Sequence, residues 1–124
     1  MSGIDFIADT NALLYLLNGN ACMQSYSSKK LGISIISEME LLSFSDINQE
    51  DEKIIRALIK DCLIFELNHQ IKNKTILLRK KYRIKLPDAI IAATAIENNI
   101  KLLTADKGFN KITELDLVIL EPTN

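Results

Sequence analysis

Short, branched apolar runs alternate along this chain with longer stretches of helical periodicity, and this alternation limits the folds that it can adopt. The runs that read as strands are residues 4–8, 32–36, 63–67, 102–103 and 117–120. The helical patterns lie at about residues 12–17, 38–42, 46–61, 69–82 and 87–98. Strands that alternate with helices favour a mostly parallel sheet covered on both faces. We therefore predict an α/β fold, a three-layer α/β/α sandwich with a roughly five-stranded sheet, in a single domain over residues 1–124.

The size and charge of the chain limit the classes of function that it can have. Its 124 residues, 48% of them hydrophobic, suit one compact domain with a buried core. Fifteen basic residues against 16 acidic ones give a net charge of -1, so any binding of nucleic acid must be local. Cys22 and Cys62 lack the spacing of a metal site, which is typical of reduced thiols. The apolar run at residues 89–96 is too short to span a membrane. We expect a soluble, cytoplasmic protein.

Four acidic residues stand at the ends of predicted elements. Asp9 and Asp106 follow strands, whereas Glu40 and Asp88 lie near the starts of helices. The carboxyl ends of parallel strands share one edge of a sheet, so all four can converge there. Such hard oxygen ligands favour Mg²⁺ or Mn²⁺ over zinc. An ordinary explanation stays open for each acid, namely a helix cap or a turn, and for Glu40 a capping box with Ser37.

The neighbours of these acids carry a resemblance to a known family. Residues 9–14, 34–41, 86–95 and 103–109 read DTNALL, SIISEMEL, LPDAIIAATA and LTADKGF, in this order and over nearly the whole chain. They resemble the PIN domain, specifically the VapC-like toxin ribonucleases, and the last two segments are the specific ones. The resemblance implies a PIN-like fold. It also implies an acidic quartet with two polar supports, which are Asp9, Glu40, Asp88, Asp106 and, as supports, Asn11 and Thr104.

Glu38 competes with Glu40 for one position of the quartet. Side chains two positions apart on a helix point in directions about 200° apart, so only one of the two glutamates can face the site. The spacing from Ser34 and Ser37 favours Glu40.

The chemistry expected of such a site is metal-dependent hydrolysis of a phosphodiester bond. Neighbouring carboxylates repel one another unless a cation lies between them, and a bound Mg²⁺ or Mn²⁺ would also lower the pKa of a water molecule. We expect Asp9 and Asp106 to bind the metal directly. Asp88 would serve a second metal position or a metal-bound water, and Glu40 would bind metal or take the proton of the water. The resemblance implies an endoribonuclease that leaves a 5′-phosphate, whereas the acids alone fit DNA equally well.

The densest positive stretch precedes the Asp88 helix and is the candidate region for contacts with nucleic acid. The candidate contacts are Arg79, Lys80, Lys81, Arg83, Lys85 and Lys107. Lys111 is a further phosphate candidate, and Tyr82 could stack on a base. The alternative is a solvated helix end whose cations suit the helix dipole.

The resemblance also implies partners, namely a small antitoxin whose peptide blocks the acidic cleft and a second copy in a homodimer. Two other functions stay open. One is a PIN-like module that binds nucleic acid or protein with little or no catalysis. The other is a receiver-type phosphoacceptor domain, which the sequence disfavours because Thr10 stands where a second acid is needed and strand 63–67 does not end in Asp.

Overall fold

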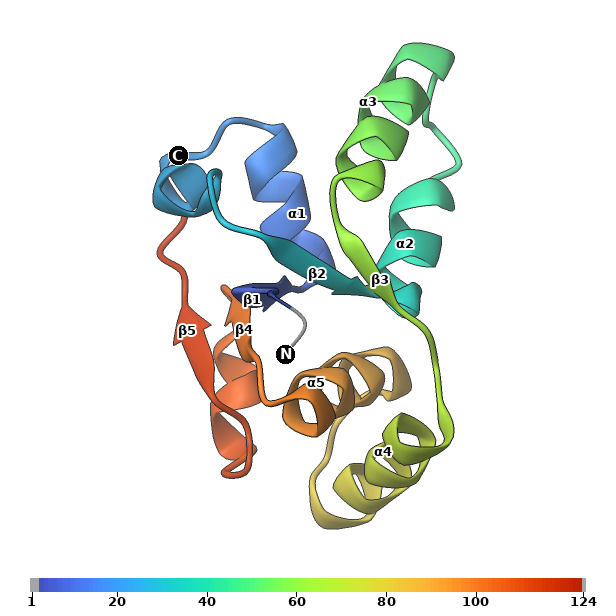
Figure 1. Cartoon of the computed structure of the whole chain (residues 1–124), viewed down its shortest axis with the longest axis vertical. Helices are drawn as coiled ribbons and strands as arrows, with labels where there is room; N and C mark the ends of the chain where they lie inside the picture. The colour runs from blue at the N-terminus through green and yellow to red at the C-terminus, as the bar shows by residue number, and fades with distance from the viewer. Residues whose placement is uncertain (1–2, 124) are drawn as a thin grey trace.

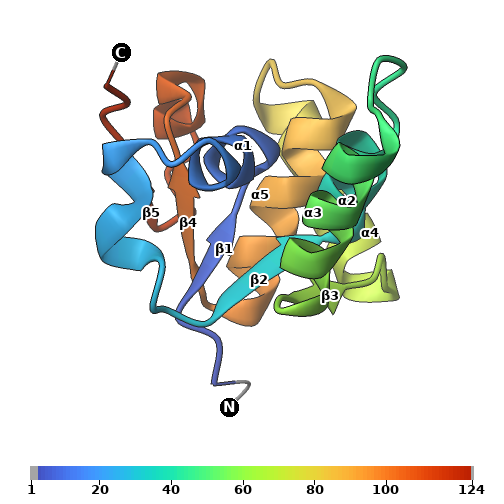
Figure 2. The ribbon, with the colours of Figure 1, turned by 90° about the horizontal axis from the view of Figure 1, so that it is seen from above.

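The computed structural model describes residues 3–123 and shows one sheet with helices on both faces (Figure 1). The strands are β1 (Phe6–Ala8), β2 (Leu31–Ser34), β3 (Leu63–Phe65), β4 (Lys101–Thr104) and β5 (Leu117–Ile119). They pair in parallel in the order β3-β2-β1-β4-β5, which Figure 2 shows from one edge to the other. The predicted α/β fold with a roughly five-stranded, mostly parallel sheet is confirmed.

Helices fill the connections between the strands. They are α1 (Thr10–Leu17), α2 (Ile35–Leu42), α3 (Gln49–Lys60), α4 (His69–Lys81) and α5 (Leu86–Asn98), with short 3-10 helices η1 (Ala21–Tyr26) and η2 (Lys107–Lys111). Helices α1, α2 and α3 lie on one side of the sheet, and α4 and α5 lie on the other (Figure 1). Within residues 3–123, no helix is long and apolar enough to cross a membrane.

Each face of the sheet has its own hydrophobic core because successive strand residues point to opposite faces. Ile7 of β1 and Leu102 of β4 pack in the core beneath α4 and α5. Ala8 and Leu103, one residue further along, belong to the core beneath α1, α2 and α3. Both strands are therefore buried on both sides, which explains their continuous apolar sequence.

The start of α2 corrects one prediction. The apolar run at residues 32–36 does not continue as a strand, because β2 ends at Ser34 and α2 begins at Ile35. Ser34, and not Ser37, caps this helix, since its Oγ accepts a hydrogen bond of 3.1 Å from the backbone N–H of Ile36. The branched side chains favour a strand locally, but Ile36 instead packs from the first turn of α2 against the core beneath α5. The capping-box explanation of Glu40 is therefore wrong.

Side-chain caps also explain why two other helices start a few residues away from their predicted starts. Helix α1 begins at Thr10, two residues early, because Asp9 is its cap. Helix α3 begins only at Gln49, since Asn48 accepts a hydrogen bond of 2.7 Å from the N–H of Asp51. Pro87 is the second residue of α5, where its missing N–H costs no helical hydrogen bond.

Candidate active site

Asp9 is buried at the junction of β1 and α1. Its Oδ1 accepts a hydrogen bond of 2.8 Å from the N–H of Ala12 and so caps α1. Its Oδ2 accepts a bond of 2.5 Å from the Thr104 hydroxyl, and its own N–H donates to the carbonyl of Leu103. Only 5% of the residue is exposed. Both carboxylate oxygens are therefore fixed in position, and the capping role of Asp9 coexists with its place in the site.

Thr104 connects Asp9 to Asp106. The Thr104 side chain is completely buried at the end of β4, and its Oγ1 accepts a hydrogen bond of 3.0 Å from the N–H of Asp106. Asp106 in turn caps η2, because its Oδ1 accepts from the N–H of Gly108 at 2.8 Å. A Cβ atom at position 108 would lie 3.0 Å from this Oδ1, so glycine lets the turn close tightly around the carboxylate.

Asp88 and Glu40 come from helices on opposite sides of the sheet. Asp88 is half-buried in the first turn of α5. Glu40 is exposed near the end of α2, where its Oε1 accepts a hydrogen bond of 2.5 Å from the hydroxyl of Thr10. The same hydroxyl lies 3.1 Å from Ser37 Oγ. Thr10 thus links the first turn of α1 to α2 and orients Glu40.

The four carboxylates line one cavity of about 230 Å³, which we call the acidic cavity. Its lining residues are Asp9, Thr10, Asn11, Leu14, Glu40, Phe44, Asp88, Ile91, Asp106 and Phe109. Neither Glu38 nor any Lys, Arg or His of the described chain is among them. The structure thus brings together acids that are up to 97 residues apart in the sequence, the separation of Asp9 and Asp106 (106 minus 9).

Burial, and after it the crowding of these carboxylates, raises the pKa values of two of them. Burial is the main reason why the pKa of Asp9 is raised, and the charges of Asp106 and Asp88 add to it against the hydrogen bond from Thr104. The pKa of Asp88 is also raised, first by burial and then by the charges of Asp106 and Glu40. A cation in the cavity would offset these costs of ionisation.

The donor set fits a hard divalent cation in its chemistry. As the side chains stand, no group of three or more His, Cys, Asp or Glu residues in the described part is placed to hold a metal ion. The acidic cavity nevertheless offers carboxylate oxygens of four residues, and an oxygen that accepts one hydrogen bond keeps a second lone pair. Oxygen-only donors suit Mg²⁺ or Mn²⁺ rather than zinc.

The structure places some of the predicted supporting residues and cations at a cavity and others away from it. Asn11 lines the acidic cavity, and Thr104 hydrogen-bonds to two of its acids. Thr10 was not predicted as a supporting residue. Its position directly after Asp9, which places it in the first turn of α1, was the signal that could have indicated it. A second cavity of about 220 Å³, which we call the basic cavity, is lined in part by Arg83, Lys85 and Lys111.

The other predicted cations lie elsewhere. Arg79, Lys80 and Lys81 form the last turn of α4, and neither they nor Lys107 are among the described residues that line the acidic or the basic cavity. Tyr82 packs against the core, and its hydroxyl donates to Glu114. The contacts of all these residues with nucleic acid stay predictions.

Comparisons with known proteins agree with the motifs and the fold. A toxin-antitoxin complex from Klebsiella pneumoniae contains a chain 28% identical to this one, with a TM-score of 0.79 over 92% of this chain and 96% of that chain. VapBC-1 from nontypeable Haemophilus influenzae has 25% identity and a TM-score of 0.79, over 94% and 98% of the two chains. VapBC2 from Rickettsia felis, bound to a DNA fragment from its promoter, has 20% identity and a TM-score of 0.83 over 95% and 100%, which shows the fold alone. The search of curated protein sequences gives no match. The family model of the PIN domain matches residues 6–115. The chain therefore belongs to the PIN domain family.

Proposed function

We propose that this protein is an endoribonuclease that depends on Mg²⁺ or Mn²⁺ and acts as the toxin of a toxin-antitoxin pair. One observation carries the proposal, namely that Asp9, Glu40, Asp88 and Asp106 line a single cavity. Membership of the PIN domain family supports a nuclease. The similarity to chains of toxin-antitoxin complexes supports the role of a toxin and a small antitoxin as its partner. We expect a homodimer in solution.

The side chains of the acidic cavity suit different steps of hydrolysis. Asp9 and Asp106 would hold the metal directly, because they lie at the ends of β1 and β4 and are joined through Thr104. Asp88 would serve a second metal position or a metal-bound water. When bound, the ion supplies positive charge for the phosphate oxygens and lowers the pKa of the attacking water. Glu40 accepts from Thr10 at Oε1, which leaves Oε2 to take the proton of that water.

Asp9→Asn tests the assignment. Asparagine keeps the oxygen that caps α1 but removes a negative charge from the cavity, so we expect folding to persist and cleavage to be lost. Cleavage of a panel of defined RNAs would be measured with Mn²⁺, with Mg²⁺ and with EDTA. Asp116→Asn is the matched control, because Asp116 is exposed just before β5, at the opposite edge of the sheet. Cleavage that survives in Asp9→Asn, or that proceeds equally in EDTA, contradicts the proposal.

A binding module with little or no catalysis is the second candidate. It is favoured by the lack of a group of acids, within residues 3–123, that is already placed to hold a metal ion. Binding of RNA without cleavage at any concentration of either metal would support it. The receiver-type alternative loses its basis, because the chain belongs to the PIN domain family.

A further inference from the structure

Three cavities share lining residues and so form a row. The acidic cavity shares Asp88, Asp106 and Phe109 with the basic cavity. It also shares Leu14 and Phe44 with a third cavity of about 480 Å³, which we call the apolar cavity. The acidic cavity therefore lies between the other two, and a strand bound across it would extend into one or both.

Positive charge is present at one end of this row. Arg83 and Lys85 come from the segment between α4 and α5, and Lys111 comes from η2. Lys111 Nζ donates a hydrogen bond to the backbone carbonyl of Arg83, which ties the two walls of the basic cavity together. Asp88 lines both cavities, so the positive charges of Lys85 and Lys111 lie next to the boundary with the acidic cavity.

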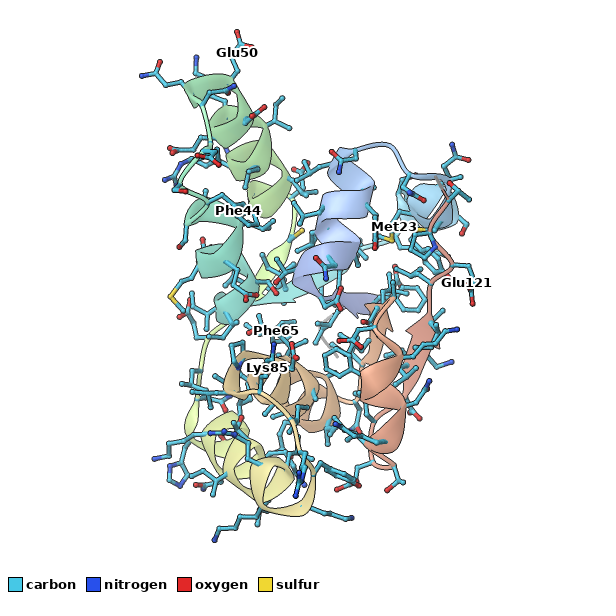
Figure 3. All side chains as sticks on the ribbon, turned by 180° about the vertical axis from the view of Figure 1, so that it is seen from behind. Met23, Phe44, Glu50, Phe65, Lys85 and Glu121 are labelled. Atoms are coloured by element: carbon cyan, nitrogen blue, oxygen red, sulfur yellow. The ribbon has the colours of Figure 1, made fainter. Side chains whose placement is uncertain are left out.

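The other end of the row repels phosphate. The apolar cavity is lined mainly by apolar side chains, with the neutral Asn18 and Ser45 and the acidic Asp46 and Asp51, and without a Lys, Arg or His from the described residues. Two carboxylates would repel a phosphate placed there, and no cation would offset this Coulomb repulsion. Figure 3 shows Phe44 beside α2 and Lys85 beside α5, the elements that flank the two ends of the row.

We propose that the basic cavity binds a backbone phosphate next to the scissile phosphate of the RNA substrate, so that the strand is held on one side of the acidic cavity only. The proposal rests on the proposed function, because it takes RNA as the bound strand. The guanidinium of Arg83 suits a phosphate through paired hydrogen bonds, and the ammonium groups of Lys85 and Lys111 add point charges.

Binding without cleavage tests the site first. The affinity of wild type and of Arg83→Gln/Lys111→Gln for a fluorescent oligoribonucleotide would be measured by anisotropy in EDTA over a range of salt concentrations. Each phosphate contact that is lost should reduce the slope of log affinity against log salt by about 0.7. Lys85→Gln, which leaves the link between Lys111 and Arg83 intact, should give a change in the same direction.

A matched control separates a site from general charge. Lys29→Gln/Lys30→Gln removes the same two charges from exposed positions just before β2, at the opposite edge of the sheet, and should leave the slope unchanged. An equal effect of the two double variants, or no effect of Arg83→Gln/Lys111→Gln and Lys85→Gln, overturns the proposal.

Cleavage then locates the bound phosphate. The substrates would be oligoribonucleotides in which a single phosphate is replaced by a neutral methylphosphonate. The kcat/KM of wild type should fall when the replaced phosphate lies on one side of the cut and should not change when it lies on the other. Arg83→Gln/Lys111→Gln should no longer distinguish the two sides. Equal losses on both sides in wild type overturn the one-sided arrangement. If wild type cleaves nothing while the variants still weaken binding, the proposed function fails and the phosphate site stands.

Discussion

Thr104→Val removes one buried hydroxyl that connects two of the four acids. The hydroxyl donates to Asp9 Oδ2 at 2.5 Å and accepts from the N–H of Asp106 at 3.0 Å. Valine has a similar shape but can form neither bond, and the position is fully buried, so water cannot replace them. We expect a loss of stability that a cavity or a volume change cannot explain.

The size of the loss follows from the two bonds. A hydrogen bond to a charged group contributes about 1.5 to 3 kcal/mol and a neutral one about 0.5 to 1.5 kcal/mol, so the free energy of unfolding should fall by ~2–4 kcal/mol. For a domain of this length, 1 kcal/mol corresponds to about 4 °C, which gives a decrease in Tm of roughly 8 to 16 °C. Thr104→Ser is the control, because it keeps the hydroxyl and loses only a buried methyl group, at a cost of about 1 kcal/mol.

The loss should also depend on pH. Burial raises the pKa of Asp9 above 3.8, and the Thr104 hydrogen bond opposes that rise. Without the bond the folded-state pKa rises further, so the difference between Thr104→Val and wild type should be largest where Asp9 is ionised and should shrink as the pH falls through the raised pKa values. Urea unfolding in EDTA at a series of pH values, from about 8 down to the acid limit of folding, measures both effects. A Thr104→Val variant within about 0.5 kcal/mol of Thr104→Ser at about pH 8, or a difference independent of pH, refutes the reasoning.

Three further predictions concern packing, the metal and pH. Gly32→Ala should reduce the free energy of unfolding by about 1 to 3 kcal/mol, because the added Cβ would lie 2.5 Å from Cε2 of Phe65; unchanged urea unfolding contradicts this. Gly108→Ala should weaken the rise in Tm with added Mn²⁺, since its Cβ would crowd Oδ1 of Asp106; an unaltered metal titration contradicts the role of that oxygen. Because the pKa of Asp9 is raised in the folded state, its protonated carboxyl contributes stability that is fully present below the pKa of the unfolded state. This stability is lost as the pH rises through the pKa of the folded state. Tm in EDTA should therefore fall with rising pH in that range, and Mn²⁺ should offset the fall. A Tm that responds equally to pH with and without Mn²⁺ speaks against a metal among these carboxylates.

Local patterns were sufficient for much of the fold. The alternation of apolar runs and helical periods predicted the layers, since burial on both faces makes the strand sequences continuously apolar. The boundaries were less certain, because branched residues such as Ile35 and Ile36 suit a strand until packing against other elements places them in a helix. The short helices η1 and η2 have no apolar periodicity and were not predicted.

By itself, the sequence determined the order of the elements, the family and the identity of the four acids, because each depends on residues that are neighbours in the chain. Only the tertiary structure decided which side chains meet. The strand order places β1 beside β4, so Thr104 can hold Asp9 across 95 residues, and it brings Thr10 to Glu40 across 30. The tertiary structure also decided that Arg83, Lys85 and Lys111 line the basic cavity, whereas the cations at the end of α4 do not. Distances between remote residues depend on the pairing of strands and the packing of helices on them, which local propensity does not encode.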